Sequence, residues 1–322
     1  MKIRCFKGIA LLLSLLMLTA MMPVFAESIY GPVEIVSGER TLTFTEMPTR
    51  VISLEDHFTE ELLALGLEEY IIGRCESNVD EILPEYQEAY SRIPVIETQK
   101  ETDSYPSFEV IVSMEPDLVL CNHFGDDYNP SFEAYAEAGI QGLAKSAVYA
   151  ETPSPENVYQ DIMNLGRIFN VEDRAQELVD ELKGSMETVK EMIGEIESPV
   201  TVVVCDFQDG NEVFTAGKHL ESQLIELAGG VNVFAATAEK SWMRVSAEEI
   251  VAANPDVILF NDYGSTSVEE KIATFKATEA FADIPAVVND RMCVIGLHEV
   301  YDSLHIAVAV EKMAKQFYPD KF

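Results

Sequence analysis

Positive charge is scarce in this chain. Lys and Arg number 22 against 56 Asp and Glu, and the formal net charge is −34 at pH 7. Nucleic acids and anionic lipid surfaces would be repelled by such a surface, so neither is an expected partner. A strongly anionic ligand is also disfavoured unless a few bases gather in its binding cleft.

Cysteine is scarce as well. Cys75, Cys121, Cys205 and Cys293 follow neither a disulfide framework nor a zinc-binding spacing, and Cys5 lies in a basic amino-terminal stretch. Cys121, Cys205 and Cys293 lie within or at the end of expected strands, in the segments LVLCN, VVVCD and MCVIG. Buried free thiols are therefore expected.

Motifs of the common catalytic sites are missing too. The chain has no GxSxG elbow, no phosphate-binding glycine loop, no HExxH and no CxxC. Isolated acids and histidines occur, but no pattern sets a nucleophile beside a base. The sequence therefore predicts a protein that is not an enzyme, with a secreted enzyme as a distant alternative.

A long apolar run occurs only at the amino terminus. Three bases precede an apolar core over residues 9–22, and Val24 and Ala26 are small residues suited to a cleavage site. This pattern predicts a signal peptide over residues 1–26 and a periplasmic or extracellular protein, with an uncleaved anchor as the alternative. No cysteine follows the apolar core, so a lipid-modified terminus is not indicated.

One segment of the chain occurs twice. Residues 108–120 read FEVIVSMEPDLVL, and residues 247–259 read AEEIVAANPDVIL. Each copy predicts a short amphipathic helix that ends before a proline, then a Pro-Asp turn, then a buried strand. Two copies of one helix-turn-strand unit indicate two similar α/β lobes, with a ligand between them.

The rest of the chain fits the same organisation. After an edge hairpin at residues 33–46, strand and helix signals alternate, which indicates a mostly parallel sheet. The longest helical pattern follows, with a break at Asn170. We therefore predict an α/β fold of two similar Rossmann-like lobes joined by one long α-helix. The expected boundaries are residues 27–153 for the first lobe, 154–198 for the linking helices and 199–322 for the second lobe. Strands of the first lobe are expected at 51–54, 70–73, 92–96 and near 147–149.

Several longer motifs carry a family resemblance. They are PTRVISL followed by ELLALGL, then PSFEVIVSMEPDLVL, TAGKHLESQLIELAGGVNVF, WMRVSAEEIVAANPDVIL and IPAVVNDRMCVI. In this order the chain resembles the substrate-binding proteins of ABC importers for iron–siderophore complexes and corrinoids, the vitamin B12-binding type included. The resemblance implies a monomer without cofactor that takes a metal chelate between its lobes and delivers it to a permease dimer in the membrane.

Two glutamates match family positions that dock on the permease. The resemblance implies that Glu109 and Glu248 each meet an arginine pocket on one permease half. Both open a helix of the repeated unit, at equivalent points of the two lobes. A carboxylate at a helix start is also stabilised by the helix dipole, which is the structural alternative.

Candidate ligand contacts lie in the loops beyond the carboxyl ends of the strands. Trp242 is the only tryptophan, and the resemblance places it where a flat ring packs on the ligand; ordinary packing is the alternative. Arg244 and Lys218 are the best cations for an acidic group on a ligand, unless they are surface charges. The full candidate set is His57, Phe58, Tyr105, His123 and Phe124 in the first lobe, with Lys218, Trp242, Arg244, Tyr263, Tyr301 and His305 in the second.

The histidines support a rival hypothesis. His57 and His123 follow two strands of one lobe, so they could converge on a haem iron or on bare zinc, manganese or iron. No histidine-rich loop is present, and the motifs match the chelate-binding group. The net acidity favours a neutral or cationic chelate, but the sequence leaves its identity open between siderophore, corrinoid and haem.

Overall fold

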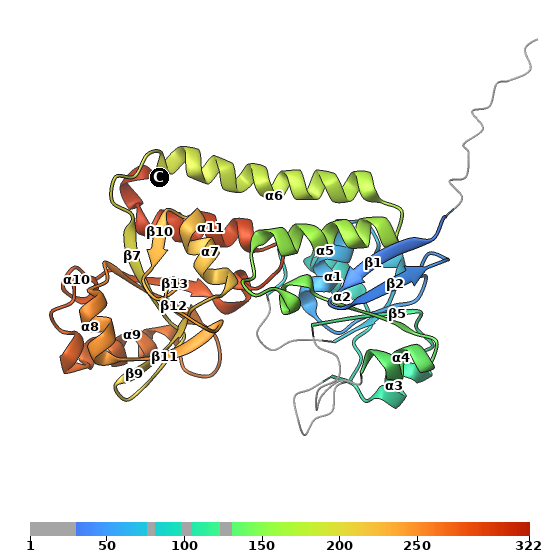
Figure 1. Cartoon of the computed structure of the whole chain (residues 1–322), viewed down its shortest axis with the longest axis horizontal. Coiled ribbons are helices and arrows are strands. Elements are labelled where there is room, and N and C mark those ends of the chain that lie inside the picture. Colours follow the sequence, from blue (N-terminus) through green and yellow to red (C-terminus); the bar gives the residue numbers. More distant parts are fainter. Residues whose placement is uncertain (1–29, 76–80, 98–104, 123–130) are drawn as a thin grey trace, which may run out of the picture.

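Two lobes lie side by side beneath one long helix in the computed structural model of the protein (Figure 1). The structure describes residues 30–75, 81–97, 105–122 and 131–322. The predicted signal peptide lies outside these residues. The predicted fold class, two similar α/β lobes joined by a long helix, is confirmed.

A four-stranded parallel sheet forms the centre of the first lobe. Its strand order is β4-β3-β5-β6. All four residues of β5 are buried, as expected of a strand covered on both faces. Gly38, with a φ of +62°, closes the predicted hairpin of β1 and β2. The elements are β1 (Val33–Ser37), β2 (Arg40–Phe44), β3 (Val51–Ser53), α1 (Asp56–Ala64), η1 (Glu68–Tyr70), β4 (Ile71–Arg74), α2 (Gln87–Arg92), α3 (Phe108–Ser113), β5 (Leu118–Cys121), α4 (Phe132–Glu137), β6 (Gln141–Ala144) and η2 (Ser146–Tyr149).

The second lobe repeats this sheet and adds another. Its parallel sheet has the order β10-β7-β12-β13, and a separate antiparallel sheet has the order β11-β9-β8. The elements are β7 (Val200–Cys205), β8 (Phe207–Asp209), β9 (Glu212–Ala216), α7 (Leu220–Leu227), β10 (Gly230–Asn232), β11 (Trp242–Ser246), α8 (Ala247–Ala253), β12 (Val257–Asp262), α9 (Val268–Ala277), η3 (Glu279–Phe281), α10 (Pro285–Val288), β13 (Met292–Gly296), η4 (Leu297–Val300), α11 (Ile306–Phe317) and η5 (Pro319–Lys321).

The repeated unit performs the same structural task in both lobes. The carboxylate of Asp117 accepts hydrogen bonds from the backbone N–H groups of Thr49 (2.7 Å) and Arg50 (3.0 Å), just before β3. The carboxylate of Asp256 accepts from the backbone N–H and the hydroxyl of Thr201, within β7. Each Pro-Asp turn therefore fixes the start of its own strand against the neighbouring central strand of the sheet.

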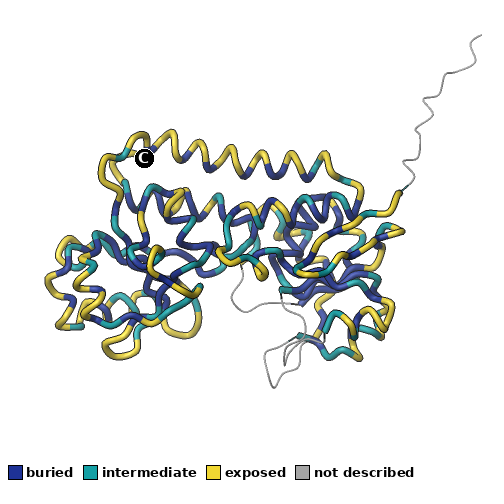
Figure 2. Tube along the Cα trace, in the orientation of Figure 1, coloured by how far each residue is buried: buried dark blue, intermediate teal, exposed yellow. Residues whose placement is uncertain are grey.

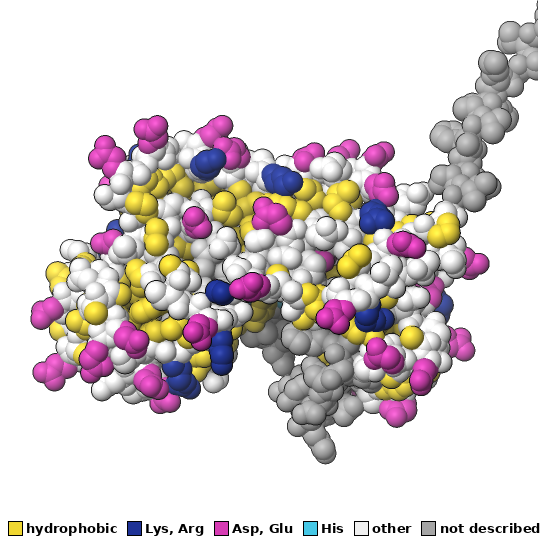
Figure 3. Space-filling model, in the orientation of Figure 1, with side chains coloured by type: hydrophobic (Ala, Val, Ile, Leu, Met, Phe, Trp, Pro, Cys, Tyr) yellow, Lys and Arg dark blue, Asp and Glu magenta, His cyan; other side chains and the backbone are white. Residues whose placement is uncertain are grey.

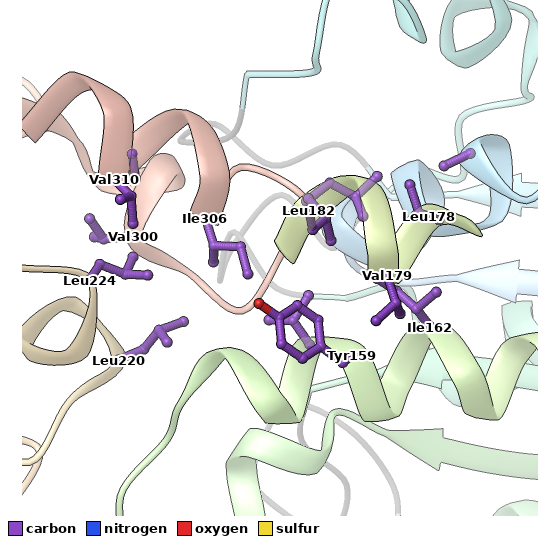
Figure 4. Close-up of a cluster of buried hydrophobic side chains, with 14 of the residues drawn as sticks. Tyr159, Ile162, Leu178, Val179, Leu182, Leu220, Leu224, Val300, Ile306 and Val310 are labelled. Atoms are coloured by element: carbon purple, nitrogen blue, oxygen red, sulfur yellow. The ribbon is translucent and has the colours of Figure 1, made fainter. Parts of the chain in front are cut away.

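Two helices, α5 (Pro155–Ile168) and α6 (Glu172–Ile193), connect the lobes. Asn170, with a φ of +55°, separates them as predicted. One face of α6 is buried along its length, while its other face is exposed (Figure 2). In Figure 4, Leu178 and Leu182 of α6 belong to one buried cluster with Ile306 of α11. The lobes thus share a continuous core.

Two predicted strands of the first lobe are wrong. Residues 92–96 form only one bridge, between Arg74 and Val95, because Pro94 has no N–H to donate to a ladder. Residues 147–149 belong to η2, and the strand comes earlier as β6. Among the residues that the structure describes, no helix has the length and apolar character needed to cross a membrane.

Candidate functional site

The carboxyl ends of the two parallel sheets meet at the junction between the lobes. His57 follows β3 of the first lobe, and Tyr301 follows β13 of the second. Their ring centroids lie 5.3 Å apart in an edge-to-face arrangement. Tyr263 follows β12 and donates a hydrogen bond of 2.7 Å to the carboxylate of Asp206, at the end of β7. Three predicted residues, His57, Tyr263 and Tyr301, therefore lie on the facing ends of the two sheets.

Beside this junction, one face of the antiparallel sheet carries a row of half-buried aromatic rings. Phe207, Phe214 and Trp242 come from β8, β9 and β11, and we call them the aromatic row. The Phe207 and Phe214 centroids are 5.0 Å apart, and the Phe214 and Trp242 rings stack at 5.5 Å. His219 lies 4.6 Å from the Trp242 ring. The row is an apolar strip with a polar end.

The predicted cations lie at the edges of this strip. The guanidinium of Arg244 lies 5.4 Å from the Phe207 ring centroid and 3.7 Å from each of the carboxylates of Asp209 and Glu212. Lys218 forms an ion pair of 3.1 Å with Glu151, which precedes α5. Arg244 is exposed and partly neutralised, while Lys218 helps to join the second lobe to the connecting helices.

The first lobe supplies a hydroxyl and a carboxylate. The Tyr105 hydroxyl donates a hydrogen bond to Glu55, the residue before α1, and the Cys121 thiol lies 3.9 Å from the same carboxylate. Burial and the neighbouring Glu55 charge raise the pKa of Tyr105, so its phenol stays protonated and acts as a donor.

Burial sets the protonation of His57. Desolvation, followed by the positive charges of Lys145, His305 and His298, lowers the pKa of His57 to about 3. The imidazole is therefore neutral at physiological pH. It can offer one N–H donor and one lone pair to a neighbour, but no charge.

Three predicted contacts, His57, Phe58 and His305, are buried. Phe58 has no exposed area, and the Lys145 ammonium lies 4.4 Å from its ring centroid. The reason is that α1 begins at Asp56, so its first turn directs Phe58 into the core. His305 is also buried, where its Nε2 lies 2.9 Å from the Glu60 carboxylate. Predicted residues His123 and Phe124 lie outside the described residues.

A buried acidic group in the second lobe escaped the sequence analysis. Glu221, in the first turn of α7, has no exposed area, and its Oε2 accepts a hydrogen bond of 3.4 Å from Asn261. Burial raises the pKa of Glu221 to about 8. A glutamate in the first turn of a helix is normally exposed, so no sequence pattern indicated that Glu221 is buried. Phe214 was not predicted as a site residue, because its strand, EVFTA, has the composition of an ordinary core strand.

Metal ligation finds no further support in the described part of the chain. There, no group of three or more His, Cys, Asp and Glu side chains is placed to hold a metal ion. The bare-metal hypothesis depends on His123, so it stays a prediction. The four cysteines of the described residues are buried and free, as expected.

The predicted docking glutamates occupy matched positions. Glu109 is the second residue of α3, after the N-cap Ser107, and Glu248 is the second residue of α8, after the N-cap Ser246. Both side chains are exposed. Each lobe therefore presents one carboxylate at the same point of its repeated unit.

A separate groove of about 570 Å³ lies beneath α6. It is lined by α5, α6 and α7, with Tyr159, Met186 and Leu227 among its residues. None of the predicted contacts that fall within the described residues lines it. Its volume suits a small ligand, but its residues carry none of the features described above.

Comparison with known proteins identifies the family. Residues 51–298 match the periplasmic binding protein family. The chain belongs to this family. A periplasmic binding protein of known structure from Veillonella parvula has 24% sequence identity and a TM-score of 0.78, over 89% of this chain and 98% of that one.

Two relatives carry names that bear on transport or on the ligand. An uncharacterized ABC transporter substrate-binding lipoprotein, YvrC, from Bacillus subtilis (strain 168) is 24% identical, over 89% of this chain and 85% of its own. A vitamin B12-binding protein from Yersinia pestis (strain Pestoides F) is also 24% identical, over 75% of this chain and 79% of its own.

Proposed function

We propose that the protein is the substrate-binding component of an ABC importer and captures a metal chelate of the corrinoid or iron–siderophore type between its lobes. The observation that carries this proposal is the aromatic row beside the junction, where His57 and Tyr301 meet. The names of the two relatives, an ABC transporter component and a vitamin B12-binding protein, agree with it.

The chemistry of the junction fits a large and partly apolar ligand. Half-buried aromatic rings gain apolar contact area when a chelate covers them. Tyr263 and Tyr301 add hydroxyl groups near the row, and neutral His57 can donate to or accept from polar groups on the ligand. Of the predicted cations in the part of the chain that the structure describes, Arg244 is exposed and Lys218 is half-buried and ion-paired, which favours a neutral or singly acidic chelate over a trianionic one.

The first test is a binding panel. Cyanocobalamin, hemin and ferrioxamine B are titrated against the purified protein by isothermal calorimetry, and native mass spectrometry records the stoichiometry. We expect one ligand per monomer with a dissociation constant below about 1 μM, which corresponds to about −8 kcal/mol. Tight binding of free zinc or manganese, with no binding of any chelate, would replace this proposal with the bare-metal hypothesis.

Export and retention are part of the same proposal. The sequence predicts that the chain is exported by residues 1–26 and is not a lipoprotein, although YvrC is named as one. Mass spectrometry of the protein from its own host tests this directly, since an amino terminus at residue 27 without lipid is expected.

A further inference from the structure

One stretch of the second lobe reaches into the first. The crossing segment, Leu297–His305, comprises η4 and the turn before α11. Four of its side chains interact with groups outside their own lobe, two of them as histidines beside a glutamate carboxylate, one as a ring contact and one through its charge. They are His298 toward Glu81, Tyr301 toward His57, Asp302 toward Lys145 and His305 toward Glu60.

The strongest of these contacts is buried. His305 Nε2 lies 2.9 Å from Glu60 Oε2, and the two side chains are 7% and 2% exposed. The other carboxylate oxygen of Glu60 accepts a hydrogen bond of 2.5 Å from the backbone N–H of Leu83. A buried polar pair is costly to break, because each partner would lose its hydrogen bond without regaining water. This contact therefore fixes α1 of the first lobe against the start of α11.

A second buried group lies in the electrostatic field of charges from the first lobe, α5 and the second lobe. The Lys145 ammonium has no exposed area and lies 2.5 Å from Glu61 Oε1. The charges of Asp161, on α5, and Asp302, in the crossing segment, also act on Lys145. A single buried cation thus interacts with carboxylates from three parts of the molecule, so a change in lobe orientation alters its surroundings directly.

The same segment also touches the candidate binding junction. Tyr301 contacts His57 and lies next to Asp302 in the chain. The turn is tied together internally, because the Ser303 N–H donates to the Tyr301 carbonyl (2.9 Å) and the His305 N–H donates to the Ser303 hydroxyl (3.2 Å). A displacement of Tyr301 would therefore move Asp302 and His305 with it.

We propose that the crossing segment is a latch between the lobes, which fixes their relative orientation and couples it to what occupies the junction at Tyr301. The latch itself follows from the buried contact between Glu60 and His305, with the charge of Asp302 acting on the buried Lys145 beside it. Its coupling to a ligand rests on the proposed function. The spacing of Glu109 and Glu248 depends on lobe orientation, so the latch would report occupancy to a partner that contacts both lobes.

Inter-lobe distances test the latch without any ligand. Spin labels are placed at Glu137→Cys on α4 and Glu269→Cys on α9, both exposed positions, and the buried native cysteines of the described residues are poorly accessible to the reagent. Double electron–electron resonance compares the parent protein with Glu60→Gln, Asp302→Asn and the control Glu88→Gln, an exposed glutamate of α2. We expect a narrow distance distribution for the parent and the control, and a broader, shifted one for both latch variants.

A broad distribution in the parent, or parent-like widths in both latch variants, would overturn the latch. If Glu60→Gln fails to fold, Asp302→Asn alone decides the question, since it keeps the Glu60–His305 contact.

The same samples with cyanocobalamin or hemin test the coupling between the latch and the ligand. The mean inter-lobe distance should shift on binding in the parent and not in the variants. A shift that persists in the variants would refute the coupling. Failure of every probe to bind would count against the proposed function. The widths of the inter-lobe distance distributions measured without ligand would still show whether the latch exists.

Discussion

At the scale of single residues, buried ionisable groups make stability depend on pH. The pKa of Glu221 is raised from 4.5 to about 8 by burial. Below pH 4.5 the Glu221 carboxyl is protonated in both the folded and the unfolded protein, so ionisation takes nothing from the free energy of unfolding. As pH rises toward 8 the unfolded state ionises first, and the free energy of unfolding falls.

We therefore predict that Glu221→Gln removes this loss, because an amide does not ionise. The difference in unfolding free energy between variant and parent, measured by urea denaturation, should rise in favour of the variant from about pH 5 to pH 8. Glu226→Gln, at an exposed position of the same helix, should follow the parent. Parallel curves for parent and Glu221→Gln would show that Glu221 ionises normally.

Trp242 gives a direct readout of the aromatic row. Its ring stacks on Phe214 and is half-buried, so a bound chelate would cover it. Trp242→Ala should weaken chelate binding by about 1–3 kcal/mol, and Trp242→Phe by less, because the phenyl ring retains part of the contact. In the parent, binding should quench the fluorescence of this sole tryptophan. Unaltered affinity in a folded Trp242→Ala protein would remove the row from the site.

Individual contacts were harder to predict than their neighbourhood. The rule that ligands lie beyond the carboxyl ends of parallel strands led to His57, Tyr263 and Tyr301, which lie at the facing ends of the two sheets. It did not foretell that His57, Phe58 and His305 are buried, because the first turn of α1, or a polar partner in the other lobe, decides whether a side chain faces inward. Such partners are distant in sequence, and no local pattern encodes them.

At the scale of elements, the repeated unit was the most reliable signal. Its helix cap, its proline and its apolar strand follow from local sequence, so both copies fold as predicted, while the aspartate bonds reach residues 55 or more positions away. The strand expected at residues 92–96 failed because ladder pairing depends on the neighbouring strand as well as on its own residues. The β8-β9-β11 sheet was not foreseen: β8 and β9 form a local hairpin, but β11 pairs with β9 across 26 or more residues, which no local pattern encodes.

We predict that Asp117→Ala destabilises the protein by about 1–3 kcal/mol, because two backbone N–H groups lose a charged acceptor. Asp256→Ala should also destabilise the protein, since its carboxylate accepts from the backbone N–H and the hydroxyl of Thr201. The isosteric change Asp117→Asn retains one acceptor oxygen and should cost less. Urea denaturation at fixed pH measures all three. An Asp117→Ala protein as stable as the parent would show that Pro116 alone determines the turn.

At the scale of the whole molecule, two features matter: strong negative charge and a pair of matched lobes. Asp and Glu side chains are spread over both lobes and α6 on the face drawn in Figure 3. Most of this charge is solvated and does not indicate a specific binding partner. Glu109 and Glu248 differ from the rest because their positions in α3 and α8 are equivalent, one on each lobe.

A permease built of two similar halves would meet both glutamates at once. Arginine–carboxylate hydrogen bonds are strong and directional, and a first contact raises the effective concentration for the second. The double change Glu109→Ala with Glu248→Ala should therefore sharply reduce ligand uptake by cells or proteoliposomes with the cognate permease. Ligand affinity and thermal stability should stay nearly unaltered, because both side chains are exposed.

The matched control is Glu191→Ala with Glu195→Ala, at the end of α6, which lies on the opposite side of the molecule from α3 in Figure 1. It changes the net charge by the same amount, so it separates a specific contact from long-range electrostatics. Transport should be normal in this control and fall further in the docking double mutant than in either single mutant. Full transport by the docking double mutant would leave both glutamates as favourable helix-start residues, and the repeated unit as a purely structural duplication.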